Sequence, residues 1–457
     1  GTVVYDRDNI SFPSGNQTID EVTYNNLTIN GTDDTDIKTA SGTTLDVNGN
    51  LTITNGKLDM NTNTVTLELD GDFSMAAGAF DAGSSTTHTV GGSWTETAGT
   101  FTSGAAGKFT FEAAAGNTTI TTLASFHDLS IETGGNSVSA AADLTVNNDF
   151  TMTAGNTGNF STGTNTVEVT GATNIVGGIL EIAASPGIFD ANDFDANGAF
   201  VTFTGNGTLK LGGNAGSTPD LGTLDATTND GTVEYDLDGN QGVFNATYHH
   251  LEIDNNTGTA TAASALGVEG NLTITTGKLT LDNIALTLGG DFVLTSGEFV
   301  PGSSNLHTVS GDWNDAGGTF DGTPGSTGKF TFNGAGSTIT TDAAGGNKFF
   351  NLNINPGGGN TVSAGSELDI DGDLEVTTGT MDMAGFDANV AKKTDVDGIL
   401  LIGSGQFDSP LPFGQTLIDA LGTVSIEGGT YIANVINSSG TLEFLGVGGT
   451  LEIIGSN

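Results

Sequence analysis

Oxygen-bearing side chains recur at the spacing of a calcium loop between residues 190 and 198. Asp193, Asp195 and Asn197, followed by glycine, match the first half of an EF-hand loop, in which alternate side chains turn their oxygens toward one ion. The twelfth position of such a loop is Thr204 rather than glutamate, so Asp190 and Asn192 would have to supply replacement oxygens. Because Asp and Asn also form ordinary turns, two interpretations stay open, a Ca²⁺ site or a turn. No other cofactor is expected.

The five histidines are the residues best suited to general acid–base chemistry, and their positions argue against that role. His88 and His307 occupy one position of a repeat, each two residues before a valine, and we expect both to be outward-facing strand residues with a structural role. His127, His249 and His250 lie where the matching segment near the start of the chain has asparagines. Since asparagine cannot serve as a general base, the sequence predicts no catalytic residue and a protein that is not an enzyme.

Carboxylates dominate the charge of the chain, with 54 Asp and Glu against 10 Lys and Arg and a formal net charge of −44. Clustered basic residues are needed to bind phosphate, so we expect neither nucleic acid nor an anionic membrane surface as a partner. No apolar run is long enough to insert into a membrane. Cysteine is absent, which excludes disulfides and thiolate metal sites.

Paired carboxylates also suggest an alternative function. Asp369, Asp371 and Asp373 alternate and should form an acidic stripe on the solvent face of a strand. Carbohydrate-cleaving enzymes built on β-helices place acidic residues on such a face. Arg7 is the one arginine of the chain, so an arginine base has little support. A polysaccharide-binding or polysaccharide-cleaving protein is the alternative interpretation.

A repeat of 21 residues shows which elements must position these side chains. Large apolar residues and glycines return at a constant offset, which is typical of a solenoid whose neighbouring coils stack like on like. The first copy is Leu69, Asp72, Phe73, Gly78, Phe80 and Gly83, and the second is Val90, Ser93, Trp94, Gly99, Phe101 and Gly104. The offset recurs when Leu288, Phe292 and Phe299 are followed by Val309, Trp313 and Phe320.

Polar and apolar residues alternate within each coil, as at Leu51 and Ile53 against Thr52 and Thr54, so each strand has one core face and one solvent face. A period of 21 is too long for one hairpin strand and suits a coil of about three short strands. Since parallel crossovers are almost always right-handed, the sequence predicts an all-β fold. It is a right-handed parallel β-helix (β-solenoid) with coils of about 21 residues and a single elongated body.

Four similar openings divide this body into modules. GTVVY at 1–5, GKFTF at 107–111, GTVEY at 231–235 and GKFTF at 328–332 are each followed by an aromatic residue, two variable residues, Leu, one variable residue and Ile. We expect one continuous solenoid over 1–457 with internal modules 1–106, 107–230, 231–327 and 328–457, duplicated as A-B-A-B.

Three runs carry a resemblance to a known class of repeat. TYNNLTI at 23–29, LDVNGNLTITNGKLDM at 45–60 and TLELDGDF at 66–73 resemble the repeats of large secreted bacterial surface proteins with adhesin-like β-helical stalks. The likeness covers nearly the whole chain. It implies secretion to an extracellular or cell-surface location, attachment or matrix roles, and assembly. Surface glycans are a further expected partner, beside other copies of the chain.

Apolar strands at both ends of the chain suggest how such a protein would assemble. A solenoid without caps leaves open strand edges, and two such edges can join in a non-closing contact that forms a fibre. The sequence therefore predicts an extracellular structural protein, a filament subunit or adhesin stalk, whose copies join head to tail. The expected interface residues are Val3, Val4, Tyr5, Leu451, Ile453 and Ile454.

Overall fold

The computed structural model of the chain describes residues 1–6, 16–114, 116–315, 317–320, 328–409 and 415–454. Contacts divide the chain into two compact units, Gly1–Asn214 with Pro219–Thr232 (unit 1) and Ala215–Thr218 with Val233–Asn457 (unit 2). Each unit is a parallel β-solenoid, and together they contain about 20 turns. The predicted module boundaries and the single continuous body stay predictions.

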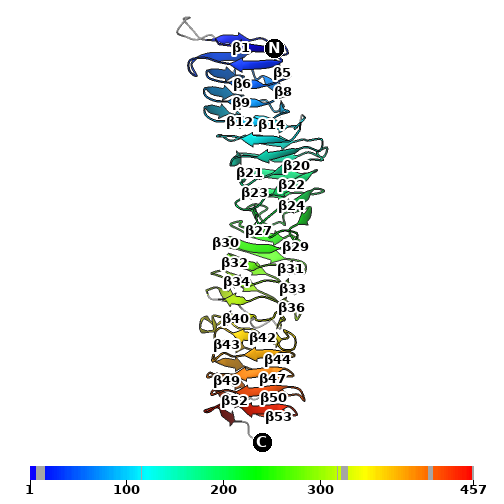
Figure 1. Ribbon diagram of the computed structural model, residues 1–457, viewed down its shortest axis with the longest axis vertical. Helices are drawn as coiled ribbons and strands as arrows, with labels where there is room; N and C mark the ends of the chain where they lie inside the picture. Colours follow the sequence, from blue (N-terminus) through cyan, green and yellow to red (C-terminus); the bar gives the residue numbers. More distant parts are fainter. Residues whose placement is uncertain (7–15, 115, 316, 321–327, 410–414, 455–457) are drawn as a thin grey trace. The chain divides into compact units, whose positions relative to one another are not determined.

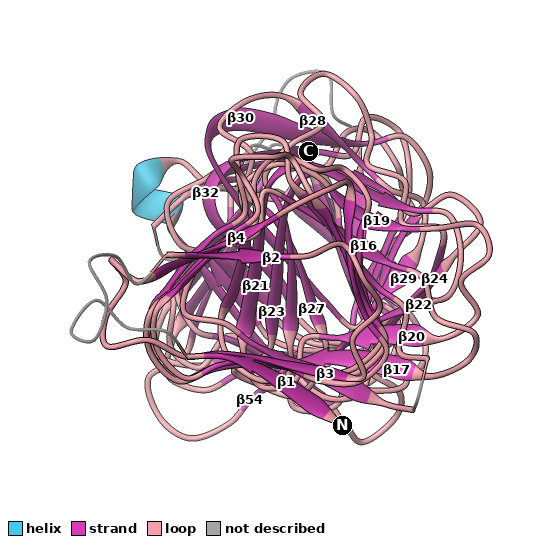
Figure 2. Ribbon diagram, turned by 90° about the horizontal axis from the view of Figure 1, so that it is seen from above, coloured by secondary structure: helices cyan, strands magenta, loops and turns pink. Residues whose placement is uncertain are grey.

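One turn of unit 1 shows how a coil is built. Strands β3 (Asn26–Ile29), β4 (Ile37–Ala40) and β5 (Thr44–Val47) form three sides of the turn, and each pairs in parallel with its equivalent one coil later. Viewed end on in Figure 2, β1 and β3 lie along one side of the N-terminal coils and β2 and β4 along another. Because pairing runs between coils, the chain needs no hairpins, and the predicted all-β parallel β-solenoid is confirmed.

The strands of unit 1 form three parallel sheets, and in Figure 1 the successive strands of these sheets are coloured from blue to green. The first contains β1 (Thr2–Tyr5), β3, β6 (Leu51–Ile53), β9 (Phe73–Met75), β12 (Trp94–Glu96), β15 (Thr118–Thr121), β17 (Ser137–Ala140), β20 (Asn159–Ser161), β22 (Ile179–Ile182), β24 (Phe200–Phe203) and β26 (Thr223–Asp225). The second contains β2 (Gln17–Ile19), β4, β7 (Lys57–Asp59), β10 (Ala79–Asp81) and β13 (Thr100–Thr102). The third contains β5, β8 (Thr66–Leu69), β11 (His88–Val90), β14 (Lys108–Phe111), β16 (Asp128–Ile131), β18 (Leu144–Val146), β19 (Phe150–Met152), β21 (Thr166–Ile175), β23 (Ile188–Asp195) and β25 (Thr208–Leu211).

Unit 2 repeats this plan after β27 (Thr232–Tyr235). One sheet contains β29 (Thr247–Tyr248), β31 (Leu266–Val268), β33 (Leu286–Leu288), β36 (His307–Val309), β39 (Lys329–Phe332), β41 (Asn351–Ile354), β44 (Leu374–Val376), β47 (Lys393–Val396), β50 (Gln415–Ile418) and β53 (Val435–Ser438). A second contains β28 (Gln241–Val243), β30 (His250–Ala262), β32 (Leu272–Thr280), β34 (Phe292–Leu294), β35 (Glu298–Val300), β37 (Trp313–Asp315), β38 (Thr319–Phe320), β40 (Thr338–Thr341), β42 (Thr361–Ala364), β45 (Thr380–Asp382), β48 (Ile399–Ile402), β51 (Thr423–Ile426) and β54 (Thr441–Phe444). A third contains β43 (Leu368–Ile370), β46 (Ala388–Val390), β49 (Gln406–Ser409), β52 (Thr430–Ala433) and β55 (Thr450–Ile453). The helical element of the described residues is the short 3₁₀ turn Ala343–Gly345, and none of their helices is long and apolar enough to cross a membrane.

The core of each unit consists of columns of inward side chains, one from each coil. Phe73 lies opposite Trp94, and their rings stack with centroids 3.9 Å apart. Unit 2 has the same stack at Phe292 and Trp313, also at 3.9 Å. These are the residues of the 21-residue repeat, so the repeat corresponds directly to strand pairing between coils. Stacked rings bury large apolar area without needing a polar partner.

Glycines stand at the corners that the repeat predicts. Gly83 and Gly104 have φ angles of 73° and 75°, in the left-handed region that side chains with a Cβ rarely adopt. A Cβ on Gly104 would also lie 2.0 Å from the carbonyl oxygen of Gly83 in the preceding coil. Both the turn and the close stacking of coils therefore require glycine at this corner.

Candidate functional site

The N-terminal edge of unit 1 is open. Within the part of the chain that the structure describes, β1 pairs only with β3, with Val3 opposite Leu27 and Tyr5 opposite Ile29. Val3 and Val4 are 44% and 50% exposed, whereas the Tyr5 hydroxyl lies 3.0 Å from that of Tyr24. Two of the three expected N-terminal interface residues are thus apolar side chains open to solvent, and the third forms part of a tyrosine pair.

The C-terminal edge of unit 2 is open as well. Among the described residues, β53, β54 and β55 pair only with β50, β51 and β52. Ile453 and Ile454 are 57% and 47% exposed, and Leu451 is half-buried. Phe444 in β54 is 51% exposed, and sequence reasoning missed it although TLEF repeats the pattern of the final strand TLEI. The exposed apolar residues therefore lie at the open strand edge of unit 2.

The residues proposed for calcium do not form an EF-hand loop. Asp190, Asp193 and Asp195 belong to β23, which pairs in parallel with β21 and β25. The Asp193 carboxylate accepts a hydrogen bond from the Asn214 amide at 2.7 Å, and Asp195 accepts one from the Asn197 amide at 3.0 Å, as in an ordinary Asx turn. Burial raises the pKa of Asp190, and Lys210 opposes the rise. No group of three or more His, Cys, Asp or Glu side chains that could hold a metal ion occurs in the described residues. The calcium site stays a prediction.

The expected orientation of two histidines is wrong. His88 and His307 are fully buried rather than outward-facing, and each ring stacks on a phenylalanine at 4.5 Å. Nδ1 of His88 accepts a hydrogen bond from the Leu67 amide at 3.0 Å, and His307 does the same for Leu286 at 3.1 Å. Each imidazole therefore takes the place of a backbone carbonyl as the acceptor for a strand amide, at the residue just before backbone pairing between the two coils begins. Both histidines have the structural role that their matched positions predicted.

Burial also sets the protonation of these rings. It lowers the pKa of His88 to about 4, and that of His307 to about 4 as well, where the Pro301 carbonyl opposes the change. A neutral ring with Nδ1 accepting carries its proton on Nε2. Protonation would turn Nδ1 into a donor and remove the partner of the strand amide.

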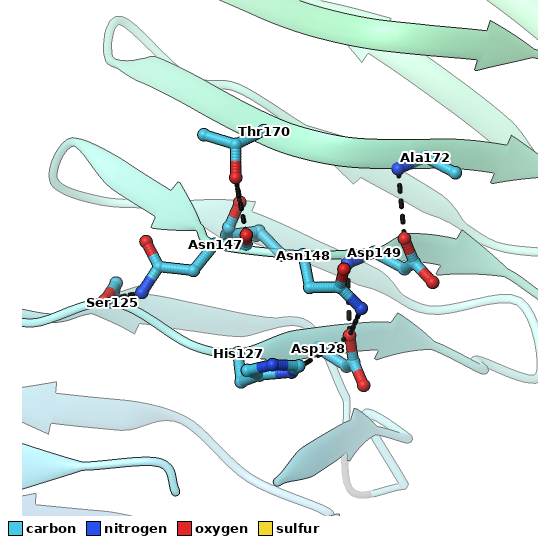
Figure 3. Close-up of polar contacts among 9 residues, drawn as sticks. Ser125, His127, Asp128, Asn147, Asn148, Asp149, Thr170 and Ala172 are labelled. Carbon is cyan, nitrogen blue, oxygen red and sulfur yellow. Dashed lines mark hydrogen bonds and ion pairs between the residues drawn. The ribbon is translucent and has the colours of Figure 1, made fainter. Parts of the chain in front are cut away.

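A ladder of corner hydrogen bonds connects successive coils, and sequence reasoning missed it. Figure 3 shows one segment, where the Asp128 carboxylate accepts from the Asp149 amide at 3.1 Å and the Asp149 carboxylate accepts from the Ala172 amide at 3.0 Å. Asn148 donates a further bond to Asp128 at 2.7 Å, and His127 lies beside the same carboxylate. Burial alone would raise the pKa of Asp128, but the bonds from Asn148 and the Asp149 amide bring it below its usual value.

The position of Asp128, two residues after the aromatic residue of its module, carries a hydrogen-bond acceptor in every module. Asn26 accepts from the Asn50 amide at 2.8 Å, His250 Nδ1 accepts from the Asn271 amide at 2.9 Å, and Asn351 accepts from the amide of the next coil at 2.9 Å. Asparagine, aspartate and histidine thus alternate because each presents one acceptor to a corner amide that strand pairing leaves free. At His250 the exchange of histidine for asparagine, which argued against a general base, has a structural cause, whereas His127 and His249 lie one residue before this acceptor position.

The acidic stripe is less regular than expected. Asp369 lies in β43, but that strand ends at Ile370, so Asp371 and Asp373 occupy the turn before β44. Each carboxylate has a partner. Asp369 accepts from the Asn389 amide group at 2.8 Å, Asp371 pairs with Lys348 Nζ at 2.6 Å, and Asp373 accepts from the backbone of the next coil at 3.1 Å. A shallow recess of about 260 Å³ lies beside them.

Two further acids lie inside the solenoid core. The Glu96 carboxylate accepts hydrogen bonds from the Trp94 indole at 2.6 Å, from the Thr122 hydroxyl at 3.1 Å and from the Leu123 amide at 3.1 Å. The matching position in unit 2 holds Asp315, one methylene shorter, which accepts from Asn347 at 2.8 Å. Burial raises the pKa of Glu96 and raises that of Asp315 to about 7. The core therefore contains titrating groups that no solvent-facing site uses.

Comparison of the chain with family models, curated proteins and solved structures finds no match.

Proposed function

We propose that this protein is an extracellular structural subunit, a filament component or adhesin stalk, whose copies join head to tail through their terminal coils. The observation that carries the proposal is the pair of open edges. At each edge a parallel strand leaves its backbone groups unpaired within the described residues and exposes apolar side chains, at Val3 and Val4 in unit 1 and at Phe444 and Ile453 in unit 2. Such edges favour addition of another strand.

The side chains that could do chemistry support a structural role and no enzymatic activity. His88 and His307 are buried acceptors for strand amides, and His250 accepts a corner amide. The carboxylates at Asp128 and Asp149 cap backbone groups of the next coil. Residues that an enzyme would use for proton transfer therefore hold coils together.

An extracellular location rests on the resemblance of the repeats to those of secreted bacterial surface proteins. The strong negative charge fits a role as a soluble spacer, because like charges keep the sides of neighbouring copies apart. Apolar contacts at the ends would then determine the direction of association.

A charge placed at one end tests the proposal. We expect the intact chain to associate end to end with rising concentration in sedimentation velocity, and Ile453→Asp to abolish this association because it puts a carboxylate on the apolar edge. Leu306→Asp is the matched control, since Leu306 is an exposed aliphatic residue away from both edges, 67% exposed. If both variants associate like the unsubstituted chain, or the unsubstituted chain stays monomeric at every concentration, the proposal is wrong.

A further inference from the structure

Among the described residues, the module-opening strands β14 and β39 each pair with a strand of the preceding coil, whereas no described strand pairs with that side of β1. β39 pairs with β41 in the register in which β1 pairs with β3, with the second residue of each opening strand opposite the leucine of the next coil. On its other side β39 pairs with β36, and the equivalent strand β14 pairs with β11. The free edge of β1 is therefore the edge at which its equivalents bind a parallel strand.

The strand of unit 2 that offers the corresponding free edge is β53. It ends the sheet that contains β39, β41, β44, β47 and β50, all of them parallel. β1 is equivalent to β39, the opening strand of the last module and a member of this sheet, so it can continue the sheet with the same strand direction. A second copy of the chain is thus the partner that supplies a matching strand.

We propose that β1 of one copy adds to β53 of another as a parallel strand, with Val3 opposite Ile436 and Tyr5 opposite Ser438. The inference rests on the head-to-tail assembly proposed above and specifies its register. It makes the sheet continuous from unit 2 of one copy into unit 1 of the next.

The register follows from which residues face the core. In β53, Ile436 lies opposite Thr416 and Ser438 opposite Ile418, both buried, so these two positions point inward. In β1 the inward positions are Val3 and Tyr5, opposite the buried Leu27 and Ile29. A shift by one residue would turn Val3 and Tyr5 toward solvent and bring outward residues into the core, which a half-buried sheet does not tolerate.

A second contact of the same joint agrees with this register. Phe349 bridges to Ile370, and the column of Ile370 continues through β46, β49 and β52 to Ile453 in β55. Tyr24 is the counterpart of Phe349 in the first module and bridges to Val47 in the same way. Stacking of the second copy therefore places Tyr24 over the exposed Ile453 when β1 lies on β53.

Disulfide trapping tests the register, because the chain contains no cysteine. Val4 and Asn437 are the outward residues between the inward pairs, so the proposal places their Cα atoms about 4.8 Å apart, within disulfide reach. Val435 lies two residues earlier on the same face, about 8 Å from Val4 in this register and beyond the limit of about 7 Å. All three positions are solvent-exposed, so cysteine should not disturb folding.

The experiment mixes singly substituted chains, so that any bond between two variants joins two molecules. V4C with N437C should give a mixed disulfide under mild oxidation, identified by mass spectrometry of the linked peptides, and V4C with V435C should give at least tenfold less. Equal yields for the two mixtures, or a mixed disulfide only with V435C, would overturn the register while leaving head-to-tail assembly in place. If neither mixture links while end-to-end assemblies persist, the β1–β53 contact is wrong. Absence of both linking and assembly overturns the proposed function as well.

Discussion

Replacing His88 by asparagine should remove much of the acid sensitivity of unit 1. In the folded chain the neutral ring accepts the Leu67 amide through Nδ1 and is fully buried. The Asn oxygen can accept the same bond but does not titrate. The variant loses the ring stack on Phe109, so we expect it to be less stable than the unsubstituted chain at neutral pH. The change with pH, not the absolute stability, is the quantity of interest.

The size of the effect follows from two pKa values. Burial lowers the pKa of His88 to about 4, while the unfolded chain keeps the ordinary value of 6.5. A depressed histidine pKa means that the unfolded state binds the proton more readily. The stability contribution is therefore fully present above pH 6.5 and is lost as the pH falls toward 4. The loss amounts to about 2 kcal/mol between pH 7 and pH 5.

Guanidinium denaturation at pH 7 and pH 5, followed by Trp94 fluorescence in a Trp313→Phe background, measures this loss in unit 1. His88→Asn should reduce the difference between the two pH values by about 2 kcal/mol. His307→Asn is the matched control, because that residue has the same contacts in unit 2 and should leave the Trp94 transition unchanged. An equally steep decline in His88→Asn and in the unsubstituted chain would refute the assignment of the proton to His88.

Two other substitutions test the buried acid and the corner ladder. Asp315→Asn should stabilise unit 2 at pH 8 by up to about 4 kcal/mol. The raised pKa of the Asp315 carboxyl means that its stability contribution is lost as the pH rises from 3.8 toward 7, and asparagine does not titrate. The thermal transition of the variant at pH 4 should therefore differ little from that of the unsubstituted chain. Asp149→Ala removes the acceptor of the solvent-exposed Ala172 amide and should cost about 0.5–1.5 kcal/mol in chemical denaturation, with faster hydrogen exchange confined to that corner. Unchanged exchange there would contradict the ladder.

The 21-residue repeat predicted the fold because pairing in a solenoid joins residues one coil apart. Phe73 and Trp94, or Phe292 and Trp313, are neighbours in space at the offset at which they recur in sequence. A constant offset therefore reports strand register directly. The corner glycines were predictable for the same reason, since stacked coils turn at equivalent positions.

The misplaced histidines show where residue type outweighed pattern. His88 stands two residues before Val90 and shares its face by the alternation of a strand, yet its polarity suggested solvent. The ring is tolerated inside because a backbone amide needs its Nδ1. The spacing at Asp193 and Asp195 favoured a metal loop because it does not reveal that both residues pair with β21, and the calcium site itself stays a prediction.

The ladder through Asp128 and Asp149 could not be read from the sequence at all. Its bonds join residues 21 to 23 positions apart and depend on the offset between two corners. The exposed Phe444 at the C-terminal edge escaped for a similar reason, since its exposure depends on which strand lies next to β54.

Cryo-electron microscopy of the intact chain over a range of concentrations tests the central claim most directly. The account predicts particles that grow end to end, with density for a continuous parallel sheet in which β1 of one copy follows β53 of another. Isolated single chains at every concentration, or association only along the sides of the solenoid, would contradict it.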